Sequence, residues 1–335
     1  MSGPDALAEW LSRAAPEPIL LPDLPIVDPH HHLWDRGGHR YLRDDLLADL
    51  SAGHRIEKSV FVECRAFYDA TAHEPLQPVG ETRMVAQQSS SARIGDRIIK
   101  PCAGIVARAD LTLGAALGPV LDAHQAASDG RLRGIRYSVA WDASPAIHAA
   151  YPAEPGMLAR DDVRAGLAML ADRGLAFDAW LYFHQIDDLI AAADAVPHLA
   201  IILDHLGGPI GIGPYADQRQ EVFGAWRSSL ARLAERPNVS VKLGGLGMAL
   251  GGFGFRKHPV PPSSQEQADA WRPYVETAID LFGPDRAMFE SNFPVDMSSG
   301  RYATIWNAFK RLSTGASADE LDRLFAGTAS SIYKI

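Results

Sequence analysis

The sequence predicts a single α/β domain folded as a (β/α)8 barrel, and three observations support this prediction. Runs of apolar residues alternate with helical patterns along almost the whole chain. Several of these runs are continuously apolar, as expected of parallel strands that helices cover on both faces. The runs number eight, and eight strands that are each followed by a helix complete such a barrel. A doubly wound open sheet is the rival fold, but no Gly-rich dinucleotide fingerprint follows an early strand.

Strand-like and helix-like segments can be placed in order along the chain. The expected strands are residues 26–28, 59–63, 100–106, 132–139, 176–183, 200–203, 239–243 and 287–291. The expected helices are residues 80–91, 114–127, 161–173, 186–195, 218–234, 264–282 and 301–312. A last helix is predicted to begin at Ser317, because Glu320 three residues later completes a capping box, and to end near Tyr333.

Size and composition indicate an ordinary globular protein. The 335 residues are 47% hydrophobic and 22% charged, which allows a large core. The formal net charge of −9 argues against nonspecific binding to nucleic acid. No apolar run reaches the roughly 20 residues of a membrane span, and the first 25 residues lack a secretory signal pattern. Only Cys64 and Cys102 are present, so no disulfide framework is implied and we expect a cytoplasmic protein.

The chain is expected to hold one domain preceded by a short extension. Residues 1–24 have the pattern of an amphipathic helix followed by a proline-punctuated linker. Residues 25–335 then form the barrel, whose size fits a single α/β barrel domain. We expect a small-molecule substrate as its partner and leave a homo-oligomer open.

The most informative segment is the Asp-Pro-His-His-His sequence at 28–32, which ends the first expected strand. Residues two apart in a strand point to the same face, so His30 and His32 aim together at the strand end, with Asp28 below them. Two imidazoles fixed in this way are half of a site for zinc or a similar metal. The alternative is a histidine-rich loop that only forms hydrogen bonds.

Polar residues also follow most of the other expected strands, where barrels of this kind hold their active sites. These residues are Glu63, Cys64, Arg65, Arg136, Tyr137, His184, Gln185, Asp204, His205, Lys242, Glu290, Asn292 and Asp296. Three imidazoles could hold a divalent ion and leave a position for an acidified water, while a further histidine or carboxylate moves the proton. Arg65 or Arg136 could bind an acidic substrate, with a salt bridge at the barrel rim as the alternative role. The side chains expected to bind substrate are Glu63, Arg65, Arg136 and Tyr137.

These motifs resemble the amidohydrolase superfamily. The segment 28–34 is similar to its D-x-H-x-H-x-W opening, and more narrowly to the amidohydrolase-related branch (amidohydrolase 2) with sugar-acid lactonases and 2-pyrone-4,6-dicarboxylate lactonase. The similarity continues at later strand ends and in the closing helix. The further matching segments are residues 132–136, 177–185, 203–207, 238–243 and 327–333. The resemblance covers nearly the whole chain from Pro25 onward, and the order and spacing of the motifs are specific.

The resemblance implies a distorted TIM barrel of the amidohydrolase type that hydrolyses an ester or lactone with activated water. Carried over by position, the metal-binding histidines would be His30, His32 and His184. His205 would contact the substrate or polarise its carbonyl group. One divalent ion, zinc or manganese, would be bound, although the branch also contains members that work without metal. No lysine suited to carbamylation stands at 136–138, which argues against a two-metal site.

The end of the eighth expected strand departs from the family pattern. The family has Gly-Ser-Asp-Trp-Pro here, and its Asp binds metal and takes the proton from water, whereas residues 290–294 read Glu-Ser-Asn-Phe-Pro. Asn292 is an amide and cannot act as a general base, although its oxygen can position water. We favour Asp296, nearer the mouth, as the replacement. Glu290 lies deeper, and an ion pair with Lys242 is its alternative role.

The predicted function is hydrolysis of a lactone or related ester of a small acidic or hydroxylated compound. The residues expected to act in catalysis are His205, Asn292 and Asp296. A lyase of the same superfamily, a decarboxylase or hydratase, is the first alternative, because such enzymes also combine strand-end histidines with a bound ion. A barrel that only binds a ligand is the second, favoured by Asn292 but opposed by the strand-end histidines.

Overall fold

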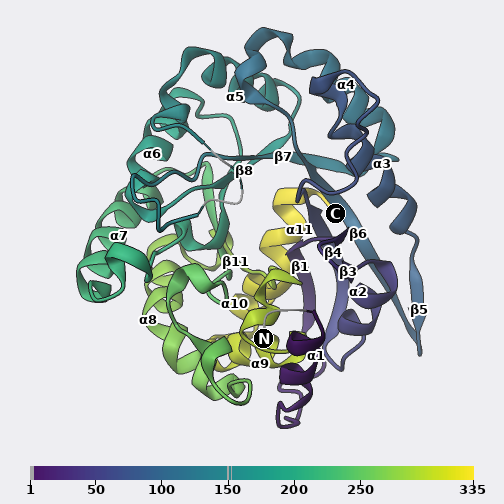
Figure 1. Ribbon diagram of the computed structural model, residues 1–335, viewed down its shortest axis with the longest axis vertical. Helices are drawn as coiled ribbons and strands as arrows, with labels where there is room; N and C mark the ends of the chain where they lie inside the picture. The colour runs from purple at the N-terminus through teal and green to yellow at the C-terminus, as the bar shows by residue number, and fades with distance from the viewer. Residues whose placement is uncertain (1–3, 149–150, 152) are drawn as a thin grey trace.

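The computed structural model describes residues 4–148, 151 and 153–335, and these form a barrel of parallel strands (Figure 1). The eight barrel strands are β1 (Pro25–His31), β4 (Arg55–Val62), β6 (Arg97–Ala107), β7 (Leu132–Ser138), β8 (Ala176–Trp180), β9 (Ile201–Leu203), β10 (Val239–Leu243) and β11 (Ala287–Phe289). Each pairs in parallel with the next. A parallel bridge between His31 and Phe293 brings the last segment back to the first strand. The predicted (β/α)8 barrel is confirmed.

Helices connect the strands and cover the outside of the barrel (Figure 1). They are α1 (Pro4–Ser12), α2 (Arg43–Leu50), α3 (Val79–Gln88), α4 (Gly118–Ala127), α5 (Asp161–Asp172), α6 (Ile186–Ala195), α7 (Arg219–Ala234), α8 (Ser264–Phe282), α9 (Tyr302–Leu312), α10 (Ala318–Asp322) and α11 (Thr328–Tyr333). One large apolar cluster fills the space between the sheet and these helices. Burial of these apolar side chains stabilises the ring of strands through the hydrophobic effect.

Some elements differ from those expected from the sequence. Three short strands were not expected: β2 (Trp34–Arg36) pairs antiparallel with β3 (His39–Tyr41), and β5 (Ala92–Ile94) pairs antiparallel with β6. The strand expected at 176–183 ends at Trp180, and the strand expected at 287–291 ends at Phe289. The residues beyond both ends leave the ladder and continue as loop or tight turn. Side chains beyond Trp180 and Phe289 therefore do not follow the alternation that was expected from counting along those two strands.

The C-terminal helix contributes to the inside of the barrel. Ser317 and Glu320 form the predicted capping box, but a turn of π-helix at Arg323–Gly327 separates α10 from α11. Ala329 and Tyr333 of α11 pack against the inward-facing side chains of the strands. The strand residues of this second apolar cluster are Val27, Val60, Val62, Val106, Ala176, Ile202 and Met288. The polar residues at the strand ends therefore stand on an interior that is already filled.

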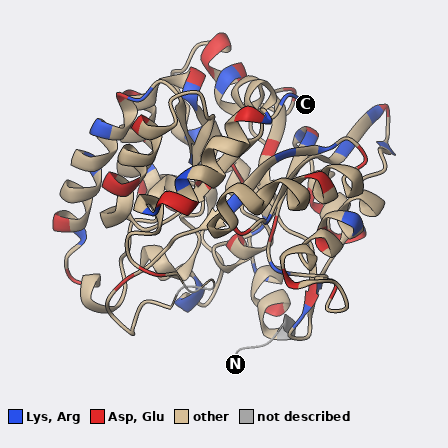
Figure 2. Cartoon of the chain, turned by 90° about the horizontal axis from the view of Figure 1, so that it is seen from above, with Lys and Arg blue, Asp and Glu red and all other residues tan. Residues whose placement is uncertain are grey.

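The N-terminal residues pack onto the barrel. Trp10 Nε1 donates to the carbonyl oxygen of His258 at 2.8 Å, and Arg301 Nε donates to that of Leu11 at 3.0 Å. Figure 1 accordingly places α1 beside α9. The domain boundary at residue 25 stays a prediction. Figure 2 shows acidic and basic residues interspersed along the helices. None of the helices described is long and apolar enough to span a bilayer.

Candidate active site

His30 and His32 stand at the carboxyl end of β1 on one face. Both rings are buried, and their Nε2 atoms are 3.3 Å apart. His32 Nδ1 lies 2.8 Å from the carbonyl oxygen of Val62, which can only accept, so Nδ1 carries the proton. Burial, with Lys242 nearby, lowers the pKa of His30, and burial, with Arg136 nearby, lowers the pKa of His32. Both rings are therefore neutral.

Glu290, directly after β11, joins His30 to a third histidine, His205. Its Oε2 lies 2.8 Å from His30 Nδ1 and its Oε1 lies 2.6 Å from His205 Nδ1. Burial raises the pKa of Glu290, but the potential of His205 and His30 and their hydrogen bonds outweigh burial and lower it to about 2. The carboxylate is thus ionised; Oε1 accepts from the ring of His205, while Oε2 has no hydrogen-bond partner among the described residues.

His30 Nδ1 also has a second polar neighbour, the ammonium group of Lys242 at 3.2 Å. An ammonium only donates and a carboxylate only accepts, so Lys242 and Glu290 favour opposite tautomers of His30. The carboxylate oxygen is nearer, but it has no hydrogen-bond partner among the described residues, whereas the ammonium group does form a hydrogen bond with Nδ1. Nδ1 of His30 therefore accepts from Lys242, and the proton of the neutral ring lies on Nε2.

This proton arrangement gives the two facing nitrogens of His30 and His32 complementary roles. Nδ1 of His32 donates to Val62, so its Nε2 is an acceptor, and His30 Nε2 donates to it across 3.3 Å. Arg136 Nη1 also lies 3.5 Å from His30 Nε2. A metal ion bound by both nitrogens would take the place of the proton between them.

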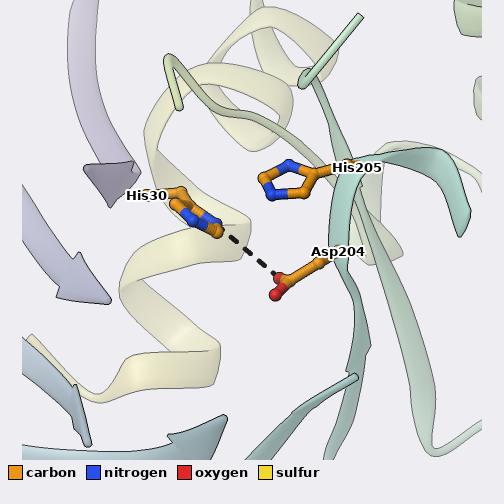
Figure 3. Close-up of side chains that lie close together, drawn as sticks. All are labelled: His30, Asp204 and His205. Atoms are coloured by element: carbon orange, nitrogen blue, oxygen red, sulfur yellow. Dashed lines mark ion pairs between the residues drawn. The ribbon is translucent and has the colours of Figure 1, made fainter. Parts of the chain in front are cut away.

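A sharp turn after β9 places Asp204 and His205 beside His30. His205 and Leu206 have φ values of 52° and 58°, in the left-handed region that is costly for residues with a side chain. The backbone N–H of His205 donates to Glu290 Oε1 at 3.2 Å and helps to hold the turn. Gly245 faces it, and a Cβ there would lie 2.5 Å from His205 Cγ. Figure 3 shows His30, Asp204 and His205 directed toward one another.

A buried ion cluster lies beneath these histidines. Lys242 Nζ is 2.6 Å from Asp178 Oδ2 and 3.0 Å from Asp204 Oδ1. Burial lowers the pKa of Lys242, but these two carboxylates outweigh burial and raise it well above its usual value. Tyr333 of α11 also donates to Asp178 Oδ2 at 2.7 Å. Breaking a buried pair leaves an uncompensated charge, so this cluster fixes the position of Asp204 beside the histidines.

Asn292 and Asp296 form a second polar pair near His205. Asn292 Nδ2 donates to Asp296 Oδ1 at 2.9 Å, and the backbone N–H of Gly247 donates to Oδ2 at 3.0 Å. Burial raises the pKa of Asp296 to about 7, against the lowering effects of His205 and these hydrogen bonds. Glu290 and Asp296 thus have pKa values pushed far apart, which is how two carboxyl groups of one site take different roles.

On the other side of His30 lies a cluster of cationic, aromatic and acidic side chains. Arg136 Nε donates to Glu63 Oε1 at 2.9 Å, and its Nη2 donates to the carbonyl oxygen of Glu63. Both Arg136 and Arg65 lie over the ring of Tyr151, at 5.5 and 4.4 Å from its centroid. Glu63 Oε2 is buried and has no hydrogen-bond partner among the described residues. A free acceptor beside two guanidinium groups suits a substrate with hydroxyl and acidic groups.

The structure does not bring His184 to His30 and His32, so that expectation is corrected. The ring is exposed, its Nε2 lies 3.0 Å from the carbonyl oxygen of Trp141, and Asp142 is 3.8 Å away. The reason is that β8 ends at Trp180, so His184 lies on a 3-10 turn beyond the strand.

Tyr137 is likewise not in the site. Its hydroxyl donates to Asp110 Oδ1 at 3.1 Å, and Arg108 lies over its ring at 5.0 Å. Since Arg136 faces the barrel interior, the next residue of the strand faces the helices. The alternation of β7 was itself the signal that could have excluded Tyr137.

Sequence reasoning missed the roles of Asp178 and Tyr151 and the contacts of Glu290. Asp178 lies within β8, two residues before its end, so the inward alternation of that strand could have found it. Tyr151 lies in a loop, where no periodic signal exists. The ion pair considered for Glu290 and Lys242 is not the main contact, because the two oxygens of Glu290 face His30 and His205.

Within the described part of the chain, one group of side chains has metal-binding geometry. His30, Asp204 and His205 offer donor atoms within 4.8 Å of one another. Neither oxygen of Asp204 accepts a hydrogen bond from the described residues, although Lys242 lies near. Imidazole and carboxylate donors suit zinc and similar ions. The donor set therefore fits a divalent metal ion.

Comparisons with known proteins agree with this architecture. The family model described as "Amidohydrolase" matches residues 27–335. The uncharacterized protein y4mH of Sinorhizobium fredii is 33% identical over 93% of this chain and 99% of its own. An L-fucono-1,5-lactonase of Burkholderia ambifaria is 30% identical over 62% of this chain and 63% of its own.

Solved structures share the fold. An amidohydrolase from Burkholderia multivorans with bound zinc superposes with a TM-score of 0.70 at 23% identity, over 92% of this chain and 99% of that one. The resemblance inferred from the strand-end motifs is thereby confirmed. From its first strand to its last helix, the chain belongs to the amidohydrolase family.

Proposed function

We propose that this enzyme is a hydrolase that opens the lactone ring of a small hydroxylated or acidic compound with an activated water. One arrangement carries the proposal: the ring of His205 lies 4.5 Å, between centroids, from that of His30, and the Asp296 carboxyl group, whose pKa burial raises to about 7, lies near His205. A group that titrates near neutral pH is suited to proton transfer. Two curated relatives, from Burkholderia ambifaria and Burkholderia multivorans, are L-fucono-1,5-lactonases, which supports this choice of reaction.

The side chains divide the work of hydrolysis. His205, whose Nδ1 donates to Glu290, has an acceptor at Nε2 that orients a water by one of its protons. Ionised Asp296 takes the other proton as the water oxygen attacks the lactone carbonyl. Asp296 then returns that proton to the ring oxygen as the C–O bond breaks, which yields the hydroxy acid. Asn292 keeps Asp296 in place through its amide hydrogen bond.

A divalent metal, zinc or manganese, is part of the proposal. His30 and Asp204 of this group would hold it, with His32 adjacent through its Nε2, while the one free ring nitrogen of His205 is kept for the water. Such an ion acidifies a bound water and polarises a carbonyl oxygen. His184 is left out of this set, because its ring lies against Trp141 instead.

The substrate class follows from the residues beside His30. Arg65 is exposed and stacks on Tyr151, so it can receive an acidic group from solvent. Glu63 Oε2 and the guanidinium of Arg136 lie deeper, where a hydroxyl group could donate to the former. We therefore favour a hydroxylated lactone, with a carboxylate directed to Arg65, over an apolar ester.

The test is an assay of ring opening on hydroxylated 1,5-lactones, with and without a carboxylate, by titration of released acid. We expect one equivalent of acid per turnover and a lower KM for the carboxylated lactone. Hydroxybenzoates, assayed for carbon dioxide release, serve as the control for a lyase. Release of carbon dioxide without any ring opening would replace the hydrolase by the decarboxylase.

The metal is tested by elemental analysis of the purified enzyme and by chelation. We expect a divalent ion bound in a stoichiometric amount, and a fall in Tm on its removal, because a ligand bound only to the folded state stabilises it. Readdition of zinc or manganese should restore Tm. Protein that contains no metal and is fully active would show that His205 and Asp296 suffice without it.

A further inference from the structure

Glu290 is a fully buried carboxylate of the site, and it contacts two histidines. Its Oε1 lies 2.6 Å from His205 Nδ1, and its Oε2 lies 2.8 Å from His30 Nδ1. The backbone N–H of His205 also donates to Oε1, at 3.2 Å. A single carboxylate thus contacts side chains at the ends of two different strands, β1 and β9.

The chain leaves space for this carboxylate. Gly244, directly after β10, faces Glu290, and a Cβ on Gly244 would lie 2.4 Å from Glu290 Cγ and from the Glu290 carbonyl oxygen. The carbonyl oxygen belongs to the backbone and cannot move aside cheaply. Only glycine therefore fits at position 244, beside the backbone and the side chain of Glu290.

The contacts of Glu290 dictate which nitrogen of the His205 ring carries a proton. An ionised carboxylate has only acceptors, so His205 donates to it from Nδ1. Nε2 of His205 then keeps its lone pair. An orienting carboxylate of this type sets ring tautomer and direction without itself reacting.

We infer that Glu290 is the positioning residue of the site, which fixes His205 as the Nδ1–H tautomer and so leaves its Nε2 atom free to accept from water. The inference rests on the proposed hydrolysis for its kinetic consequence, but not for its tautomeric one. The positioning carboxylate is thus the side chain of residue 290. Residue 292 is an amide, which hydrogen-bonds Asp296.

The sharpest variant is Glu290→Leu, which keeps the approximate size but removes both acceptors. Without an acceptor opposite Nδ1, the ring of His205 is free to carry its proton on Nε2 instead. We expect kcat to fall about 10²- to 10⁴-fold with a much smaller change in KM, as when the tautomer set by a carboxylate is lost. The histidine ring nitrogens, observed by 15N NMR, report the tautomer directly.

A second variant separates positioning from mere packing. Glu290→Gln keeps an amide oxygen that can accept from Nδ1 and from the backbone N–H of His205. We expect it to keep at least about tenfold more of the wild-type kcat than Glu290→Leu, because His205 keeps its tautomer. A packing role would give these two variants of similar size the same kcat.

The outcomes decide the inference even if a variant fails to fold. The NMR spectrum of the wild-type protein must show Nδ1–H on His205, assigned with His205→Gln. A proton on Nε2 of His205, or a folded Glu290→Leu variant with unchanged tautomer and kcat, overturns the assignment. If the wild type opens no lactone, the proposed function fails while the NMR result still decides the role of Glu290.

Discussion

Replacing His205 with alanine is expected to lower kcat about 100-fold or more and to change Tm by only a few degrees. The ring is the contact through which we propose that water is oriented, so its loss removes an interaction that turnover needs. The strand before it, β9, keeps its buried side chains, and the backbone N–H of residue 205 still reaches Glu290. The measurement is steady-state kinetics of lactone opening beside a thermal melt.

His198→Ala is the matched control. His198 is exposed and precedes β9, at the opposite end of that strand from His205. We expect its kcat and Tm to equal those of the wild type. Full activity in the His205→Ala variant would remove His205 from the catalytic site, and a collapse of Tm would show that the ring is needed chiefly for folding.

The sequence could place the histidines of β1 because two residues of one strand have a fixed relation. The alternation of a strand puts His30 and His32 on one face regardless of the rest of the fold, and the barrel pattern puts His205 at the same end. The fold itself rests on many such local signals, from apolar runs to the capping box at Ser317, which is why it was predictable.

The residues that the sequence misplaced lie beyond a strand end or depend on contacts through space. His184 was counted along a strand that ends at Trp180, and no local pattern marks that end. The role of Glu290 was predicted only from its depth in the barrel. Depth does not show whether the partner of a carboxylate is a lysine or a pair of histidines. The contact between Glu290 and His205 depends on the left-handed turn at His205 and on the close approach of Gly244 to Glu290. Both are features of the folded chain that no local sequence pattern marks.

Asp296→Asn is expected to abolish most of the activity, about 10²- to 10⁴-fold, because an amide cannot take the proton of water. In the wild type, kcat/KM should rise as the pH rises through about 7, since only the ionised form of Asp296 accepts a proton. The residual activity of Asp296→Asn should lack this rise. A pH series of both proteins on one lactone measures the two effects together.

The single variant also disturbs hydrogen bonds, so a matched double variant is needed. Asp296 accepts from Asn292 Nδ2 and from the backbone of Gly247, and an asparagine at 296 would turn its own NH2 group toward one of these donors. In the double variant Asn292→Asp/Asp296→Asn, the amide at 296 accepts from Gly247 and donates to the carboxylate at 292, so every hydrogen bond is kept.

Comparison of these variants decides what the carboxylate of Asp296 does. The double variant should regain the Tm of the wild type whether or not it regains activity. If activity returns together with Tm, a carboxylate at position 292 also reaches the water. Hydrolysis then requires a carboxylate at either position and not specifically at 296. If Tm returns without activity, Asp296 alone has that reach. Should the single Asp296→Asn variant keep its full rate, the proton goes to a histidine, and the lyase reaction becomes the better account of this barrel.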